Sequence, residues 1–233
     1  MKKVLLITHH ETSNLGIISK ILTKKYLITS IYYKNINILN SNDLLGFSAY
    51  IFFGGKMSAN SSSKTIYAEF SFLKKLIASN KLIIGICLGA QLIAKIYGSK
   101  IYKNKNNFVE IGYRKLTKNN LKFFSNVSSM LQFHNEGIGF NPYMNVLAFG
   151  RVFEIDAFKI KSKKIYGFQF HPEVNQSMIE YWYSKLSFKK QGTDNIQKIL
   201  SDHKKYKEKN YKLLSNFLFN VIKWLIFFIL MNI

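Results

Sequence analysis

The only cysteine of the chain lies where a nucleophile could act. Cys87 belongs to the sequence Gly85-Ile86-Cys87-Leu88-Gly89, directly after an apolar run typical of a buried strand and before a helical pattern. A nucleophile at such a turn stands on a strained backbone, and the flanking glycines let neighbouring segments pass close by. The positive end of the following helix favours the thiolate over the thiol. An isolated cysteine is more often a small buried side chain, so a catalytic role for Cys87 also requires other catalytic residues.

A base and a carboxylate occur together further along the chain. His171 and Glu173 flank Pro172, and residues two positions apart in an extended segment point to the same side. An imidazole can take the proton of a thiol and return it to a leaving amine, while a carboxylate orients the imidazole and stabilises the imidazolium. Together with Cys87, these residues predict a triad for nucleophilic catalysis.

A glycine pair, Gly54 and Gly55, ends another predicted strand. In a doubly wound sheet, ligands bind outside the carboxyl ends of the strands. A backbone N–H of this pair could face the carbon that Cys87 attacks and, with the N–H of Leu88, stabilise an oxyanion. Taken alone, a tight turn explains the two glycines equally well.

The elements that must position these residues follow from alternating apolar runs and helical patterns. Strands are predicted over residues 4–8, 27–33, 49–53 and 82–86, with helices at residues 15–22, 70–77 and 88–97. Between Ile101 and Gln169 the pattern favours mixed or antiparallel strands, and one more helix follows Pro172. The predicted fold class is α/β, with a central, mostly parallel sheet between layers of helices, added antiparallel strands and a C-terminal helical tail.

Two motifs resemble those of a known family. Gly-Ile-Cys-Leu-Gly-Ala-Gln at residues 85–91 and Gln-Phe-His-Pro-Glu at residues 169–173 are similar to the signatures of class I (triad-type) glutamine amidotransferases, and the spacing of 84 positions between Cys87 and His171 also matches. The resemblance extends from Val4 to about Trp182. It is closest to stand-alone proteins similar to the amidotransferase domain of GMP synthase, on the segments 53–58, 110–113 and 132–136.

The resemblance implies a flavodoxin-like three-layer sandwich and a role for each motif residue. Cys87 would be the nucleophile, His171 the base and Glu173 the orienting acid. The N–H groups of Gly55 and Leu88 would form the oxyanion hole. Gln91 and His134 would contribute to binding of the substrate glutamine. The implied reaction releases ammonia and hydrolyses a γ-glutamyl thioester, without cofactor or metal.

The sequence also departs from the family pattern and leaves alternatives open. Lys56 stands where the family usually has proline, and Asn135-Glu136 replaces a commoner Gly-Asp. Because the chain carries neither an ATP-pyrophosphatase phosphate loop nor a Walker A motif, we expect the ammonia to pass to a separate synthetase subunit, or the protein to act as a simple glutaminase. The alternatives are a γ-glutamyl conjugate hydrolase with the same triad and a catalytically idle, membrane-associated binding module.

The composition says less than the motifs about which molecules the protein binds. The net charge is +22, from 34 basic and 12 acidic residues, but only Arg114 and Arg151 are arginines. Arginine is the residue that binds phosphate bidentately, so we do not expect nucleic acid as a partner. The single cysteine excludes an intramolecular disulfide and fits a reducing compartment, so a cytoplasmic protein is predicted. His9 and His10 are expected to be solvated loop residues, and His203 to be inert.

The last part of the chain differs in composition. We predict a catalytic domain over residues 1–186 and a second segment over residues 187–233, with a boundary or hinge near Gln191-Gly192. Nine lysines lie between residues 185 and 212, and a mostly apolar stretch follows from Leu213 to Ile233. A polar stripe of Asn216, Asn220 and Lys223 runs along the stretch. The apolar stretch could lie on an anionic membrane surface or dock on a partner, span the membrane, or pack on its own domain.

Overall fold

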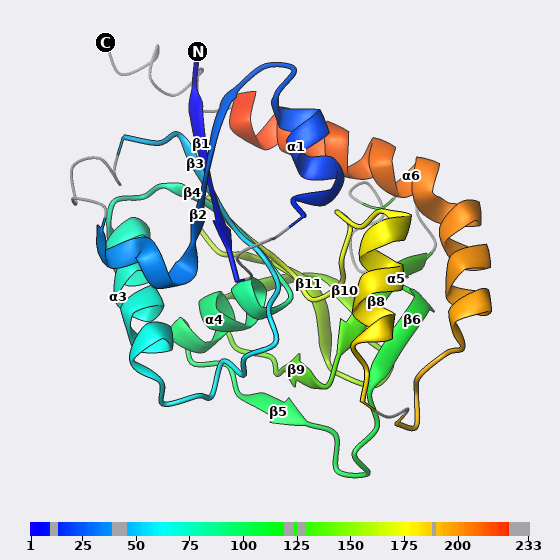
Figure 1. The fold of residues 1–233 in the computed structure, drawn as a ribbon. Coiled ribbons are helices and arrows are strands. Elements are labelled where there is room, and N and C mark those ends of the chain that lie inside the picture. Colours follow the sequence, from blue (N-terminus) through cyan, green and yellow to red (C-terminus); the bar gives the residue numbers. More distant parts are fainter. Residues whose placement is uncertain (10–13, 39–45, 119–123, 125–128, 188–189, 224–233) are drawn as a thin grey trace.

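The computed structural model describes residues 1–9, 14–38, 46–118, 124, 129–187 and 190–223 (Figure 1). The helices are α1 (Gly16–Leu22), the 3-10 helix η1 (Tyr33–Ile38), α3 (Lys64–Ala78), α4 (Leu88–Ile96), α5 (Gln176–Ser184) and α6 (Ile196–Lys223). The strands are β1 (Lys3–Thr8), β2 (Leu27–Tyr32), β3 (Ala49–Phe52), β4 (Leu82–Ile86), β5 (Ile101–Lys103), β6 (Glu110–Lys115), β7 (Thr117–Lys118), β8 (Ser129–His134), β9 (Glu136–Ile138), β10 (Met144–Phe149), β11 (Ile155–Ile160) and β12 (Ile165–Phe168).

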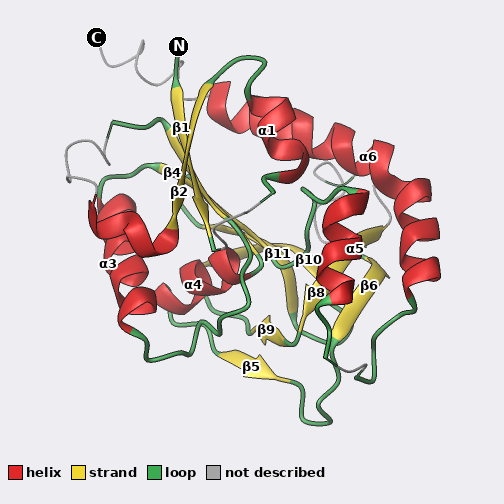
Figure 2. Ribbon diagram, viewed as in Figure 1, coloured by secondary structure: helices red, strands yellow, loops and turns green. Residues whose placement is uncertain are grey.

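Parallel strands in the order β2-β1-β3-β4-β12 form the centre of the molecule. Their side chains alternate between two apolar cores: Leu6 and Ile84 contribute to one core, and Leu5 and Ile83 to the other. Helices α1 and α6 cover the first face, and α3 and α4 cover the second (Figure 2). Strands that are buried on both faces are almost continuously apolar in sequence. The predicted α/β sandwich with its mostly parallel sheet is therefore confirmed.

The antiparallel part adjoins this sheet at β12. Strand β11 pairs antiparallel with β12, and β10 and β7 extend the sheet beyond it. Strands β6 and β8 form a separate two-stranded antiparallel sheet, against which α5 and the beginning of α6 pack. The main chain of His171 joins the segment after β12 to β8, because its N–H donates to the carbonyl of Leu131 at 2.8 Å.

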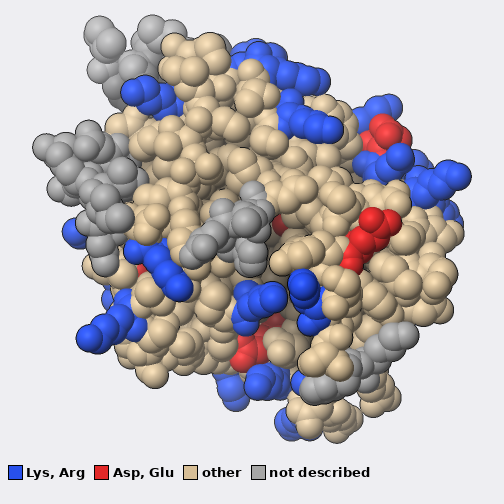
Figure 3. Space-filling model, viewed as in Figure 1, with Lys and Arg blue, Asp and Glu red and all other residues tan. Residues whose placement is uncertain are grey.

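The Lys-rich segment forms the long helix α6, which packs on the domain that precedes it. Its apolar side chains enter the core shared with α1 and the central strands; they are Leu214, Phe217, Leu218 and Ile222. The predicted polar stripe of Asn216, Asn220 and Lys223 is exposed on the other side. In the view of Figure 3, Lys and Arg side chains gather over α6. In residues 196–223 the apolar face is thus covered by the protein itself and is not open to a membrane or a partner.

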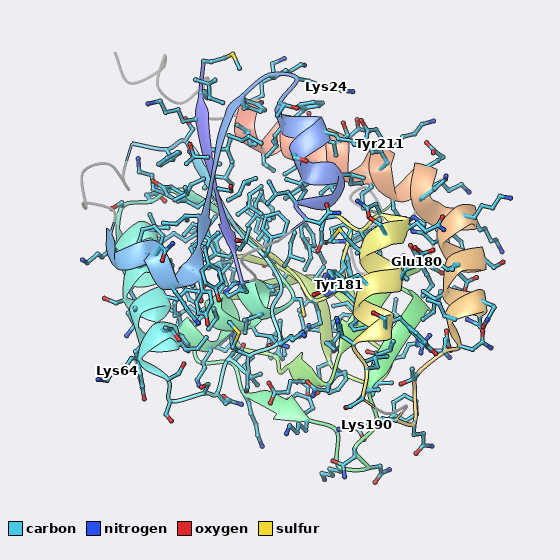
Figure 4. The ribbon with its side chains drawn as sticks, in the orientation of Figure 1. Lys24, Lys64, Glu180, Tyr181, Lys190 and Tyr211 are labelled. Carbon is cyan, nitrogen blue, oxygen red and sulfur yellow. The ribbon has the colours of Figure 1, made fainter. Side chains whose placement is uncertain are left out.

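Two contacts fix the far end of α6 to the N-terminal elements. Lys24, just after α1, donates to the Tyr211 hydroxyl at 3.3 Å (Figure 4), and Lys2 donates to the carbonyl of Ile222 at 3.0 Å. In the described part of the chain, no helix is long and apolar enough to cross a membrane. The end of the predicted apolar stretch, residues 224–233, lies outside the described residues.

The join that the sequence suggested as a boundary or hinge is bonded to β6. Val109 donates to the carbonyl of Gln191 at 3.0 Å, and Ile111 donates to that of Gly192 at 3.2 Å. Arg114 holds the next turn by an ion pair of 2.7 Å between its Nη1 and Oδ2 of Asp194. These bonds hold residues 191–194 against β6 and the residue that precedes it.

Candidate active site

Cys87 lies at a strained turn between β4 and α4. Its φ of 49° and ψ of −107° are uncommon for a residue with a side chain. A Cβ atom on Gly85 would lie 2.5 Å from the carbonyl carbon of Gly89, and one on Gly89 would collide with the carbonyl of Phe52. Both glycines are therefore required by close approach. The Cys87 N–H donates to the carbonyl of Phe168 at 2.7 Å, which fixes the turn to β12.

His171 connects Cys87 to Glu173. Its Nδ1 lies 2.8 Å from Oε1 of Glu173, and its ring and Cβ of Cys87 both lie against Gly54. Burial alone would lower the pKa of His171, but the negative charges of Glu173 and Cys87 and the hydrogen bond to Glu173 raise it to about 10. An imidazole that is oriented by a carboxylate and lies beside a thiol is the arrangement that a triad requires. The structure thus brings the three residues together.

Glu173 is fixed by its main chain as well as by His171. Its carbonyl accepts a hydrogen bond of 2.9 Å from the N–H of Ile17 at the beginning of α1. Gly16, with a φ of +59°, lies directly against the same carbonyl and has no room for a side chain. The edge of the Trp182 ring also packs on the imidazole, with centroids 4.8 Å apart. Helix α1 therefore holds the main chain of Glu173, and α5 packs on the base through Trp182.

The glycine pair after β3 lies against the same turn. A Cβ atom on Gly54 would be 2.8 Å from Cε1 of His171 and 3.2 Å from Cβ of Cys87. Gly55 lies beside Leu88, whose Cδ2 would be 2.9 Å from an added Cβ. Leu88 begins α4, so its N–H has no partner within the helix. Both expected oxyanion donors are thus close to Cys87, and close approach explains the glycines.

Gln91 and His134, the expected substrate contacts, are both bonded to the Glu136 carbonyl. Nε2 of Gln91 donates to this carbonyl at 2.9 Å, and Nδ1 of His134 lies 3.0 Å from it. Burial, with a further contribution from the charge of His171, lowers the pKa of His134 to about 3. Nε2 of His134 lies 2.9 Å from Oε1 of Gln132. The two side chains therefore hold the segment at Asn135-Glu136, where the sequence departs from the family.

Gln169 is a residue to which the sequence analysis gave no role. It is fully buried, accepts a hydrogen bond of 3.2 Å from Gln91, and places its own Nε2 3.7 Å from Sγ of Cys87. A signal was present: Gln169 precedes His171 by two positions, as His171 precedes Glu173. The same alternation that predicts the base and its carboxylate on one side places Gln169 there too.

Two further histidines are buried, and for His9 this contradicts the expectation. His9 is buried and bonded to Glu69, with its Nε2 2.9 Å from Oε1, so it is not a solvated loop residue. His203 is also buried, and its Nδ1 lies 2.8 Å from the hydroxyl oxygen of Tyr113. His10 lies outside the described residues. Periodicity could not predict these pairs, because their partners are 60 and 90 positions away.

Two buried acids lie near His134. Burial raises the pKa of Glu110 to about 7, against the opposing charges of Arg114 and Arg151. Burial and the charge of Glu110 raise the pKa of Asp156 to about 8. Oε2 of Glu110 is 3.8 Å from Nε2 of His134. In the part of the chain that the structure describes, no group of His, Cys, Asp and Glu side chains has the arrangement to hold a metal ion.

Comparison with known proteins places the chain in a family. The family model described as glutamine amidotransferase class-I matches residues 9–190, and the chain belongs to this family. The resemblance inferred from the two motifs is thereby confirmed.

Two relatives agree with this assignment, and a solved structure shares the fold. A glutamine-hydrolyzing GMP synthase subunit from Methanococcus aeolicus is 37% identical over 100 residues, 41% of this chain and 52% of that protein. A glutamine-hydrolyzing GMP synthase from Chlamydia caviae is 32% identical over 140 residues, 56% of this chain and 25% of that protein. The match thus spans about half the length of the Methanococcus relative. A glutamine amidotransferase structure from Thermotoga maritima shares the fold with a TM-score of 0.83 and 24% identity, covering 95% of this chain and 98% of that chain.

Proposed function

We propose that this protein hydrolyses the side-chain amide of glutamine through Cys87, His171 and Glu173. The observation that supports the proposal is the grouping of three side chains at a strained turn beside Gly55 and Leu88: Cys87, the imidazole of His171, and the carboxylate of Glu173 that is bonded to this imidazole at 2.8 Å. A buried cysteine with a purely structural role would need neither the positive φ nor a paired imidazole. Membership of the class I glutamine amidotransferase family supports glutamine as the substrate.

In the first half of the reaction, the Cys87 thiolate attacks the side-chain amide carbon of glutamine. The carbonyl electron pair moves to oxygen, and the N–H groups of Gly55 and Leu88 donate to the oxyanion. When the intermediate collapses, the carbon–nitrogen bond breaks and His171 gives its proton to the leaving amine. Ammonia departs, and a γ-glutamyl thioester remains on Cys87.

In the second half, water attacks the thioester, and the steps of the first half occur in reverse order. His171, now neutral, takes a proton from the water that attacks the thioester, and a second oxyanion forms at the same donors. The carbon–sulfur bond breaks, glutamate leaves, and the thiolate–imidazolium pair is restored. Glu173 accepts the Nδ1–H bond throughout and keeps the other ring nitrogen directed at the reacting groups.

We further propose that a separate synthetase consumes the ammonia. The relatives named as GMP synthase subunits support this proposal, because their name describes one part of a glutamine-hydrolyzing synthetase. The full-length protein should therefore be assayed alone and with co-purified synthetase. Amide formation by the synthetase from glutamine should require this chain, whereas amide formation from ammonium salts should not.

The direct test measures ammonia and glutamate released from glutamine by the wild type and by Cys87→Ala. Equal amounts of both products are expected from the wild type, and none above background from the variant. A γ-glutamyl anilide assayed in parallel separates the alternative, a γ-glutamyl conjugate hydrolase. Cleavage of the anilide with glutamine untouched would contradict the proposal, as would ammonia release that survives the loss of the thiol.

A further inference from the structure

We infer that His9 and Glu69 are positioning residues that fix the main chain of Gly55, the proposed oxyanion donor. This inference rests on the function proposed above and concerns a pair of side chains outside the triad. His9 directly follows β1, and Glu69 lies in α3, so the pair connects two elements that flank the loop carrying Gly55.

The pair is buried and closely bonded. Nε2 of His9 lies 2.9 Å and 3.0 Å from the two carboxylate oxygens of Glu69, and neither side chain is accessible to solvent. The ring of Tyr33 packs on the imidazole with centroids 5.1 Å apart. Among the described residues, Nδ1 of His9 has no hydrogen-bond partner. The direction of the ring is therefore set by Glu69, and a buried carboxylate is costly without such a partner.

The side chain of His9 lies directly against Gly55. An added Cβ on Gly55 would be 2.7 Å from Cβ and 3.0 Å from Cγ of His9. On another side, the same atom would be 2.9 Å from Cδ2 of Leu88. The main chain of Gly55 is thus confined between His9 and the first residue of α4. Rotation of the His9 side chain about its Cα–Cβ bond would move Cγ away and open space on one side of Gly55, so that the main chain carrying the proposed donor could shift.

The pair also holds the two ends of the loop together. The loop leaves β3 at Gly54 and reaches α3 at Ser63, whose side chain caps the helix by accepting from Ile66 N–H at 3.4 Å. His9 contacts the beginning of this loop, and Glu69 belongs to the helix at its end. Lys56 stands in this loop where the family usually has proline, which would fix one backbone angle. The His9–Glu69 pair supplies a constraint from side chains instead.

This arrangement predicts an effect on the rate of the chemical step. Removing one oxyanion donor costs about a hundredfold to a thousandfold in kcat, and a donor that is loosened rather than removed should cost roughly tenfold. Alkylation of Cys87 by iodoacetamide needs the thiolate but no oxyanion hole. A positioning role therefore lowers the hydrolysis of glutamine and spares the alkylation.

The test compares Glu69→Ala and Glu69→Gln with the wild type in the full-length protein. For Glu69→Ala, we expect kcat to fall by roughly tenfold, with KM for glutamine and the alkylation rate of Cys87 close to the wild-type values. Glu69→Gln keeps an oxygen acceptor for His9 and should recover part of kcat. Glu180→Ala, an exposed carboxylate on α5, is the matched control and should change neither rate.

An unchanged kcat in Glu69→Ala would overturn the inference, as would an equal loss of hydrolysis and alkylation. If Glu69→Ala does not fold, the rate of hydrogen exchange at the Gly55 amide is measured in Glu69→Gln instead. We expect faster exchange than in the wild type. An unchanged exchange rate would contradict the positioning role of the pair. A wild type that releases no ammonia refutes the proposed function instead, and the exchange measurement still tests the positioning pair.

Discussion

The carboxylate of Glu173 accepts a hydrogen bond of 2.8 Å from Nδ1–H of His171, and both side chains are buried. Because the Nδ1 proton is donated to Glu173, Nε2 is the ring nitrogen that can exchange a proton with Cys87. Burial favours the neutral ring, but the charges of Glu173 and Cys87 prevail and raise the pKa of His171 to about 10. The imidazolium is therefore the resting form at neutral pH, and it can give its proton to a leaving amine.

Glu173→Gln removes the charge and keeps the shape of the side chain. We expect kcat/KM for glutamine to fall by about 10²-fold to 10⁴-fold, as when an amide replaces the carboxylate of a comparable triad. The pKa of His171 should also decrease, since the charge that raises it is lost. The alkaline limit of activity, where the imidazolium loses its proton, should therefore move to lower pH.

The pH dependence of kcat/KM and the titration of His171 by NMR check this prediction. Glu180→Gln serves as the control, because Glu180 is exposed and its side chain accepts from Gln176 at 2.8 Å within α5. It should leave both curves unchanged. An alkaline limit that stays in place in Glu173→Gln would contradict the role of the carboxylate charge.

Gly54→Ala should disturb the triad without removing any of its members. The new Cβ would lie 2.8 Å from Cε1 of His171, closer than side-chain carbons approach, so the imidazole must shift from its place beside Cys87. We expect kcat to fall by about a hundredfold, since misplacement of about 1 Å at a reacting group costs that much. Gly98→Ala is the control. It adds a methyl group at a φ of +91° with no atom within 4 Å, so it should cost stability but not activity.

The sequence predicts the central sheet and the triad because both depend on local patterns. Strands buried on two faces are apolar throughout, and the turn at Cys87 needs glycines at fixed offsets. The alternation of side chains places His171 and Glu173 together without knowledge of the rest of the fold. Each of these features is encoded within fewer than ten consecutive residues.

Features that depend on how distant elements pack were not predictable in the same way. The partner of His9 is on α3, and its identity depends on how that helix lies against β1. The apolar face of α6 was visible as a periodic pattern, but periodicity does not say what covers such a face. The sequence correctly placed Asn216 and Asn220 on one exposed face, but only the fold shows that the opposite face packs on the domain.

Asp156 should make the protein less stable as the pH rises. Its pKa is raised to about 8 in the folded state by burial and by the charge of Glu110. Between the ordinary pKa of an aspartate and this value, the folded state holds a proton that the unfolded state has lost. The stability that this protonation provides is complete below the ordinary pKa and is lost as the pH rises toward 8.

Asp156→Asn should remove this dependence, because the amide stays neutral. Relative to the wild type, we expect the free energy of unfolding to rise by about 1 to 3 kcal/mol between pH 5 and pH 8, measured by urea titration at each pH. Asp194→Asn is a control of opposite sign. Burial opposes ionisation of Asp194, but hydrogen bonds from Lys198 and Arg114 hold its pKa below the usual range. Its replacement should destabilise the protein at pH 8 and progressively less toward acid.

Leu218→Ala tests whether α6 stabilises the catalytic part of the molecule. Leu218 is fully buried in the core that α6 shares with α1, and the neighbouring Phe217 packs on Phe168 of β12 with ring centroids 5.2 Å apart. Strand β12 leads directly to His171. The substitution should lower the free energy of unfolding by about 2 to 5 kcal/mol, since a buried leucine leaves a cavity.

Urea unfolding of the full-length protein, followed at the same time by circular dichroism and by the alkylation rate of Cys87, measures this effect. We expect both signals to move to lower urea together in Leu218→Ala, because α6 and β12 share one core. Asn216→Ala, on the exposed face of the same helix, should change stability by less than about 0.5 kcal/mol. A Leu218→Ala protein that loses helical signal at low urea while Cys87 keeps its native reactivity would show that α6 unfolds independently of the site.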